Sequence, residues 1–295
     1  MLWLWEEKMK RLLFIISLVY LFNGSTSFSA ETPVYPAKFE LFGIEVQEAF
    51  QKQGNNIEKL NQTLLKLAKE NNYIASFHIG KHLHLGVFQP YDDPHKNNVE
   101  GTKYLENAAE SGYPEAFGVL GDNFAFPESI GIDAEKGINF YEQGAEKGDS
   151  WSALKLGLIY RDGLLGIEPD SKRSLQYLLL ASNQINGFFM GTPDALFTLG
   201  QYYKKGIGVP RHDTMALMWI ILSRHLSESN SSVFGATLQK ATELERNYAS
   251  SMTTDGQNEA VKLANQCLEQ GLIDCNNLVP PDETNINQLI KKKLN

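Results

Sequence analysis

A repeated pair of amphipathic helices constrains the fold of this chain more than any other feature of its sequence. In the clearest copy, Ala195, Leu199 and Tyr202 follow the i, i+4, i+7 spacing of one helical face. Gly206 comes where a left-handed C-cap is expected, and Asp213 gives a capping signal before a second apolar stripe. Neither helix can bury its stripe alone, so each pair needs neighbours of the same kind.

Three further copies of this layout precede the clearest one in the chain. Each first helix contains an internal glycine, and successive glycines are separated by 41, 36 and 43 residues. A glycine inside a helix costs about 1 kcal/mol relative to alanine, so its recurrence indicates helices that approach one another closely. These glycines are Gly80, Gly121, Gly157 and Gly200. The second helices begin their stripes with the small residues Gly101, Gly137, Ser174 and Ala216.

A longer motif in the last copy points to a known family. Its residues are Ala195, Leu199, Gly200, Tyr203, Gly206, Gly208, Val209, Asp213 and Trp219. The motif resembles the Sel-one-like repeat, a branch of the tetratricopeptide superfamily, and four copies cover roughly residues 72–226. The resemblance implies an all-α chain, an α/α solenoid that makes protein–protein contacts, and it implies no particular chemistry.

The N-terminal segment predicts export. Three basic residues within 8–11 precede an apolar run over 12–22, and small or polar residues follow, an order typical of a secretory signal peptide. The run is shorter than the roughly 20 residues that span a bilayer. We therefore expect cleavage close to residue 30 and no membrane span afterwards, with an uncleaved anchor as the alternative. Translation begins at either Met1 or Met9.

Export and charge together predict where the protein is found and what it binds. We expect a periplasmic or secreted monomer of a bacterial envelope. The formal net charge of −8 disfavours nucleic acid as a partner. Cys267 and Cys275 are the two cysteines of the chain, and in an exported protein such a pair indicates one disulfide. Two free thiols are the alternative.

Helices outside the repeats complete the predicted organisation. Apolar stripes before and after the repeats indicate helices that cover the two ends of the solenoid. The prediction divides the chain into a signal peptide (1–30), an N-terminal cap or decayed repeat (31–71), four repeats (72–226), C-terminal capping helices (227–275) and a mobile tail (276–295).

No pattern in the sequence is typical of a catalytic, cofactor or metal site. The best metal candidate is the set His78, His82 and His84, of which His78 and His82 stand at the ligand spacing i and i+4, but the sequence places no acid or fourth ligand beside them. We expect the neighbouring His84 to face solvent, as the equivalent residues of the other copies do. The chain also lacks the G-x-S-x-G pattern of a nucleophilic serine. We therefore expect no enzyme, no cofactor and no metal.

The predicted function is a non-enzymatic scaffold that binds an unidentified protein or peptide on the concave face. In tetratricopeptide-like folds the first helix of each pair lines that face, so the resemblance implies that residues flanking each internal glycine reach it. The candidate partner-binding residues are His78, His82, Asn123, Lys155, Thr198 and Tyr202. The alternative function is a periplasmic enzyme, or an envelope-glycan-binding protein, that uses the same groove. An apolar segment, Phe188, Phe189 and Met190, either packs on the solenoid or binds a partner.

Overall fold

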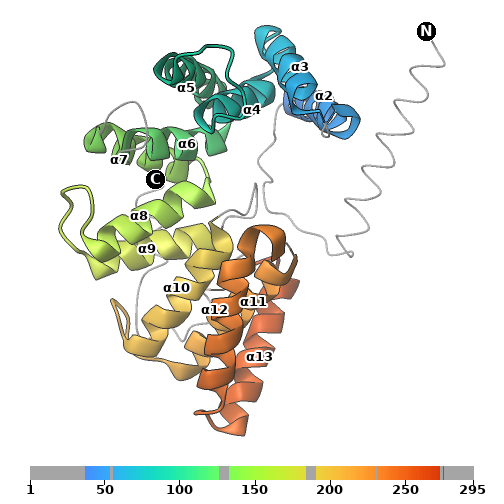
Figure 1. Ribbon diagram of the computed structural model, residues 1–295. Helices are drawn as coiled ribbons and strands as arrows, with labels where there is room; N and C mark the ends of the chain where they lie inside the picture. Colours follow the sequence, from blue (N-terminus) through green and yellow to red (C-terminus); the bar gives the residue numbers. More distant parts are fainter. Residues whose placement is uncertain are drawn as a thin grey trace. The chain divides into compact units, whose positions relative to one another are not determined.

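The regular structure of the described chain is helical. A computed structural model describes residues 37–53, 56–125, 133–183, 191–229, 231–272 and 275. Within these ranges the regular elements run from α2 to α13 and include no strand, which confirms the predicted all-α class (Figure 1). The predicted signal peptide, the segment from Phe188 to Met190 and the predicted tail lie outside the described residues. Residues 1–41 and 42–295 are separate units, and the architecture is that of the second.

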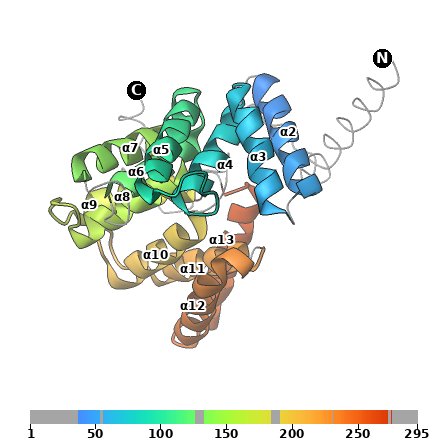
Figure 2. The ribbon, with the colours of Figure 1, turned by 45° about the horizontal axis from the view of Figure 1, so that its top comes forward.

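The helices fall into pairs that match the predicted repeats. Their bounds are α2 Ala37–Gln53, α3 Ile57–Lys69, α4 Tyr73–His84, α5 Pro94–Glu110, α6 Pro114–Ala125, α7 Ala134–Glu146, α8 Ser150–Asp162, α9 Ser171–Ser182, α10 Thr192–Lys205, α11 Asp213–Ser229, α12 Ser231–Ala249 and α13 Thr254–Glu269. The pairs α4/α5, α6/α7, α8/α9 and α10/α11 are each tightly packed, and each pair also packs against the next (Figures 1 and 2). This stepwise packing is the predicted α/α solenoid.

The internal glycines allow the two helices of a pair to touch. A Cβ atom added at Gly80 in α4 would stand 2.8 Å from the backbone carbonyl oxygen of Gly101 in α5. At Gly200 in α10 it would stand 2.6 Å from Cγ1 of Ile220 in α11. Both distances are shorter than ordinary van der Waals contact, so a side chain would push the helices apart. The close approach predicted from the recurring glycines is therefore confirmed.

Local capping explains where many of these helices begin and end. Gly206 ends α10 with a φ of 71°, the left-handed conformation predicted for it. At the start of α11, however, Nδ1 of His212 accepts the backbone N–H of Met215 (3.3 Å), while the Asp213 carboxylate pairs with Arg211 (2.8 Å). The capping residue therefore lies one position before the predicted Asp213. Side-chain N-caps of other described helices are Asn56, Asn72, Asp93, Asp133, Asp149, Asp170 and Thr253.

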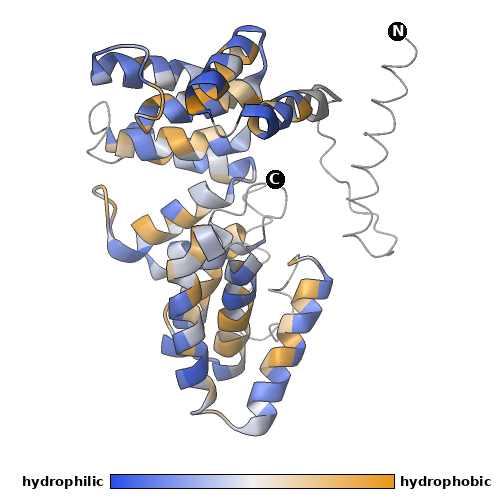
Figure 3. Cartoon of the chain, turned by 45° about the vertical axis from the view of Figure 1, so that its right-hand side comes forward, coloured by the Kyte–Doolittle hydropathy of each residue, from blue (hydrophilic) through white to orange (hydrophobic). Residues whose placement is uncertain are grey.

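Apolar stripes between the helices form the core. Figure 3 shows apolar and polar residues alternating around the helices, as expected where each helix buries one side. Trp219 is completely buried and belongs to an apolar cluster that extends from the end of α6 to Cys275, beyond α13. Among the described helices, none combines the length and apolarity needed to cross a membrane.

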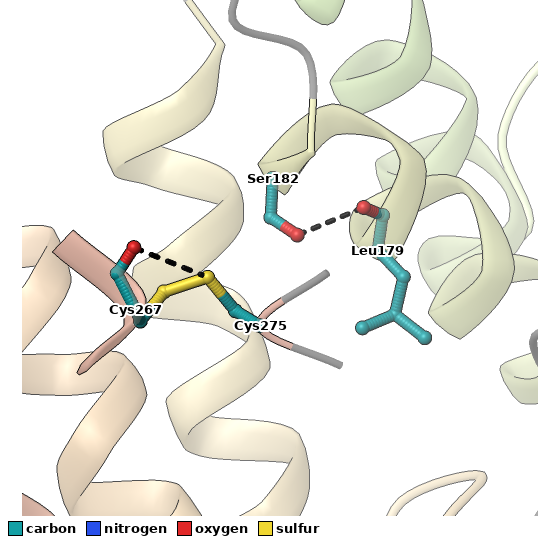
Figure 4. Close-up of a disulfide and its surroundings, with 4 residues drawn as sticks. All are labelled: Leu179, Ser182, Cys267 and Cys275. Atoms are coloured by element: carbon teal, nitrogen blue, oxygen red, sulfur yellow. Dashed lines mark hydrogen bonds between the residues drawn. A yellow bond between two sulfur atoms is a disulfide. The ribbon is translucent and has the colours of Figure 1, made fainter. Parts of the chain in front are cut away.

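Two helices after the last repeat pack against α11. Both α12 and α13 contact it, and Tyr248 of α12 donates its hydroxyl proton to the Asp213 carboxylate (2.6 Å). Cys267 in α13 and Cys275 beyond its end are joined by a buried disulfide with their Cα atoms 5.1 Å apart (Figure 4). Leu179 of α9 belongs to the same apolar cluster as these cysteines. The C-terminal segment thus covers apolar surface of the last repeats.

Candidate partner-binding pocket

A pocket of about 310 Å³ lies where α4, α6 and the start of α8 meet. We call it the α4–α6–α8 pocket. It contains two of the six sequence-predicted binding residues, His78 and Asn123. Its lining residues are Phe77, His78, Lys81, His84, Leu85, Glu115, Val119, Asp122, Asn123, Asp149 and Trp151. The pocket therefore combines aromatic and aliphatic surface with three carboxyl groups and one lysine, all from first helices or their ends.

Asp122 is the centre of the polar network in this pocket. Its Oδ1 accepts the hydroxyl proton of Tyr141 (2.6 Å), and its Oδ2 accepts the indole N–H of Trp151 (2.7 Å). Nζ of Lys155 lies 3.0 Å from Oδ1 and 4.5 Å from the centroid of the Trp151 ring. The carboxylate therefore holds the indole ring in place, and the ammonium group of Lys155 adds a cation–π contact to it.

Asp149 fixes the backbone of Trp151. Its carboxylate caps α8 by accepting the backbone N–H groups of Trp151 (3.3 Å) and Ser152 (2.9 Å). The Ser152 hydroxyl also donates to it. Burial raises the pKa of Asp149, whereas these hydrogen bonds act to lower it. Asp149 thus positions the first turn of α8, and with it the aromatic wall of the pocket.

His84 is half-buried, which corrects the expectation that it faces solvent. The side-chain amide of Asn123 donates to Nε2 of His84 (2.9 Å), and Oγ1 of Thr102 lies 3.2 Å from the same nitrogen. Nε2 is therefore an acceptor, and the ring is neutral. Burial lowers the pKa of His84 to about 4. The physical reason is that α6 and α5 both cover the C-terminal end of α4.

His78 is also uncharged at neutral pH. Burial, together with the neighbouring charges of His82 and Lys81, lowers its pKa to about 4. His82 lies one turn further along α4, where its Nδ1 donates to Oδ1 of Asn61 in α3 (2.5 Å). His82 therefore links two helices and is not among the pocket residues. Among the described residues, no group of three or more His, Cys, Asp or Glu is arranged to hold a metal.

Two predicted binding residues are buried in the last repeat, which corrects their assignment. Tyr202 is 1% exposed because it points between α10 and α9, where its hydroxyl meets the Ser174 hydroxyl (2.6 Å). Thr198 is 5% exposed and donates to the backbone carbonyl of Asp194 (2.8 Å). The α12 helix also contacts α10. Neither side chain is available as an anchor for a partner.

The sequence-based choice of binding residues also missed Asp122 and Trp151, which form the polar centre and the aromatic wall of the pocket. Asp122 comes directly after the internal glycine of α6, one position from the residues selected, and Trp151 stands six before the glycine of α8. The available signal was the Asp149 cap, because it predicts where α8 begins and hence that Trp151 lies in its first turn. Lys155, one of the sequence-predicted partner-binding residues, is not among the lining residues but contacts two of them, Asp122 and Trp151.

Comparison with known proteins agrees with this architecture. The Sel1 repeat model matches residues 80–113, 127–149, 152–186 and 193–223. A solved structure of a Sel1 repeat protein from Oxalobacter formigenes is 21% identical, with a TM-score of 0.54, and the match covers 74% of this chain and 91% of that one. This likeness concerns the fold. The chain therefore contains Sel1-like repeats, as its repeated motif predicted.

Curated relatives come from fungi. The chitin synthase regulator SKT5 of Saccharomyces cerevisiae is 29% identical over 169 residues, which are 56% of this chain and 23% of that protein. SKT5 of Malassezia restricta is 30% identical over 127 residues, or 41% of this chain and 8% of that protein. The chain thus spans less than a quarter of the length of these relatives. Because the relatives are fungal regulators, the prediction of a periplasmic or secreted protein of a bacterial envelope is wrong.

Proposed function

We propose that this chain is a non-enzymatic scaffold that binds a segment of a partner protein in the α4–α6–α8 pocket. Sel1 repeats serve in general as protein-interaction scaffolds. The observation that carries the proposal is the Trp151 ring, which lines the pocket and is held by its hydrogen bond to Asp122. Rigid, partly exposed aromatic rings in concave sites are typical anchors for a partner.

The engagement of the polar groups in the pocket favours binding over catalysis. Asp122 accepts two hydrogen bonds and forms an ion pair with Lys155. Asp149 caps a helix, and His84 accepts a hydrogen bond from Asn123. A general acid or base needs a titratable atom within hydrogen-bond reach of the substrate. These groups instead direct their lone pairs at other side chains and at backbone N–H groups.

The fungal relatives suggest what kind of protein the partner is. Their names describe regulators of chitin synthase, and their matched segments overlap the repeats of this chain. By analogy, the partner of this chain is an enzyme whose activity changes when the scaffold binds. This part of the proposal rests on the names of the relatives and on similarity over a fraction of their length.

A peptide-selection experiment tests the proposal. The full chain is immobilised, a displayed library of random 12-residue peptides is enriched on it, and selected peptides are measured by fluorescence anisotropy. Leu85 lines the pocket and is 63% exposed, so Leu85→Arg blocks the pocket without disturbing the core. Val261→Ala is the matched control, because Val261 is 48% exposed on α13.

We expect selected peptides to lose at least tenfold in affinity with Leu85→Arg and to bind Val261→Ala as they bind the parent. A Trp151→Ala variant that retains its helical circular-dichroism spectrum should lose a similar amount. The proposal fails if no peptide is enriched. It also fails if peptides bind the Leu85 variant as tightly as the parent.

A further inference from the structure

Lys155 occupies a cation site built from the chain's own side chains. Its Nζ lies 3.0 Å from Oδ1 of Asp122 and 4.5 Å from the centroid of the Trp151 ring. A carboxylate beside an aromatic face is the arrangement that binds a lysine ammonium or an arginine guanidinium. The Lys155 and Asp122 side chains are 20% and 33% exposed, so the site opens to solvent at one side.

The acceptor side of this site is rigid, whereas the cation is held by a flexible stem. Tyr141 and Trp151 both donate to Asp122, so its carboxylate keeps its orientation when Lys155 moves away. A lysine reaches its partner through four methylene groups with many rotamers. An incoming cation can therefore replace Lys155 without rearrangement of the site.

The charge of the pocket walls selects the sign of the incoming group. Three carboxyl groups, those of Glu115, Asp122 and Asp149, face one ammonium group, that of Lys81. The two histidines of the pocket are neutral above pH 6.5, because burial lowers the pKa of each to about 4. The pocket thus complements a positive charge, and its apolar walls suit an aliphatic stem.

We propose that the α4–α6–α8 pocket receives a lysine or arginine side chain of the bound segment, which displaces Lys155 from between Asp122 and Trp151. The inference rests on the proposed scaffold function and adds the chemistry of the segment that is recognised. Arginine fits best, because its planar guanidinium both stacks on an indole ring and donates to a carboxylate.

The test uses peptides selected from the random library on the full chain. Sequencing should show one position enriched in arginine or lysine. One selected peptide is then synthesised in two forms, with arginine or with citrulline at that position. Citrulline has nearly the same shape and no charge, so the ratio of the two dissociation constants reports the cation site alone.

Three results are expected. The parent chain binds the arginine form at least tenfold more tightly than the citrulline form. Asp122→Asn reduces that ratio to threefold or less. Lys155→Met, which removes the internal competitor and keeps an apolar stem, strengthens the arginine form several-fold and leaves the citrulline form unchanged. Lys172→Met, an exposed lysine on α9 outside the pocket, is the matched control and should change neither form.

The outcomes separate this inference from the broader proposal. Peptides that bind in the pocket but carry no basic residue, or that carry acidic residues instead, overturn the inference and leave the scaffold function standing. The absence of any enriched peptide overturns the scaffold function itself. If Asp122→Asn fails to fold, the Lys155→Met result decides, because weaker or unchanged binding of the arginine form contradicts displacement.

Discussion

Replacing Gly80 with alanine tests whether contact between the helices of a pair explains the internal glycines. The added Cβ atom would stand 2.8 Å from the carbonyl oxygen of Gly101 and 2.8 Å from Cγ of Leu105. The oxygen belongs to the backbone of α5, so it cannot swing aside as the end of a side chain would. The strain is therefore relieved by moving α5 relative to α4.

Two opposing terms set the size of the effect. Alanine is favoured over glycine in a helix interior by about 1 kcal/mol. Overpacking a close contact costs about 1–3 kcal/mol, and a backbone contact belongs at the upper end of that range. The net loss in the free energy of unfolding is therefore about 1–2 kcal/mol. At roughly 2–4 °C per kcal/mol for a domain of this size, the melting temperature should fall by about 2–8 °C.

Thermal unfolding followed by far-ultraviolet circular dichroism measures this difference. Gly235→Ala in α12 is the matched control, because a Cβ atom there meets nothing within 4 Å. The control should keep the parental melting temperature or raise it, since only the helix-propensity term remains. If Gly80→Ala also melts at or above the parental temperature, the close-approach explanation is refuted.

The remaining predictions concern protonation, a buried hydroxyl and the disulfide. The pKa of His84 is about 4 in the folded chain and near 6.5 when unfolded, so the unfolded state binds more protons between these values. Stability should therefore fall by about 2–3 kcal/mol as the pH drops from 6.5 to 4, and urea titrations of His84→Gln should show a smaller fall. Tyr202→Phe should cost about 1 kcal/mol by removing the hydroxyl that meets Ser174, whereas Tyr202→Ala should cost about 3–5 kcal/mol in the same titrations. An equal, small effect of both would contradict the buried position of Tyr202. Intact mass under non-reducing conditions should show Cys267 and Cys275 two hydrogens lighter than two thiols, and complete alkylation of the native protein would exclude the bond.

Sequence periodicity was sufficient to predict the helix pairs and the contacts at their glycines. A helix places residues three and four apart on one face whatever surrounds it, so apolar spacing reveals the buried stripe. The glycines at matching positions then indicated close approach between helices. The structure shows that Gly80 and Gly200 make this contact with the second helix of their own pair. The Gly206 C-cap was predictable for the same reason, because its conformation depends on its immediate neighbours in the chain.

Tertiary packing alone decided which of these side chains reach the pocket. The spacing around a glycine indicates a helix face to within about one residue, which is enough to choose His78 and too coarse to choose Asp122. Tyr202 follows the same rule as His78, but α9 and α12 pack against α10 and the tyrosine is buried. His84 is half-buried by contacts with other helices, and its hydrogen-bond partner Asn123 is 39 residues away in the chain. Such contacts depend on how successive helix pairs stack, and no local pattern of residues records that arrangement.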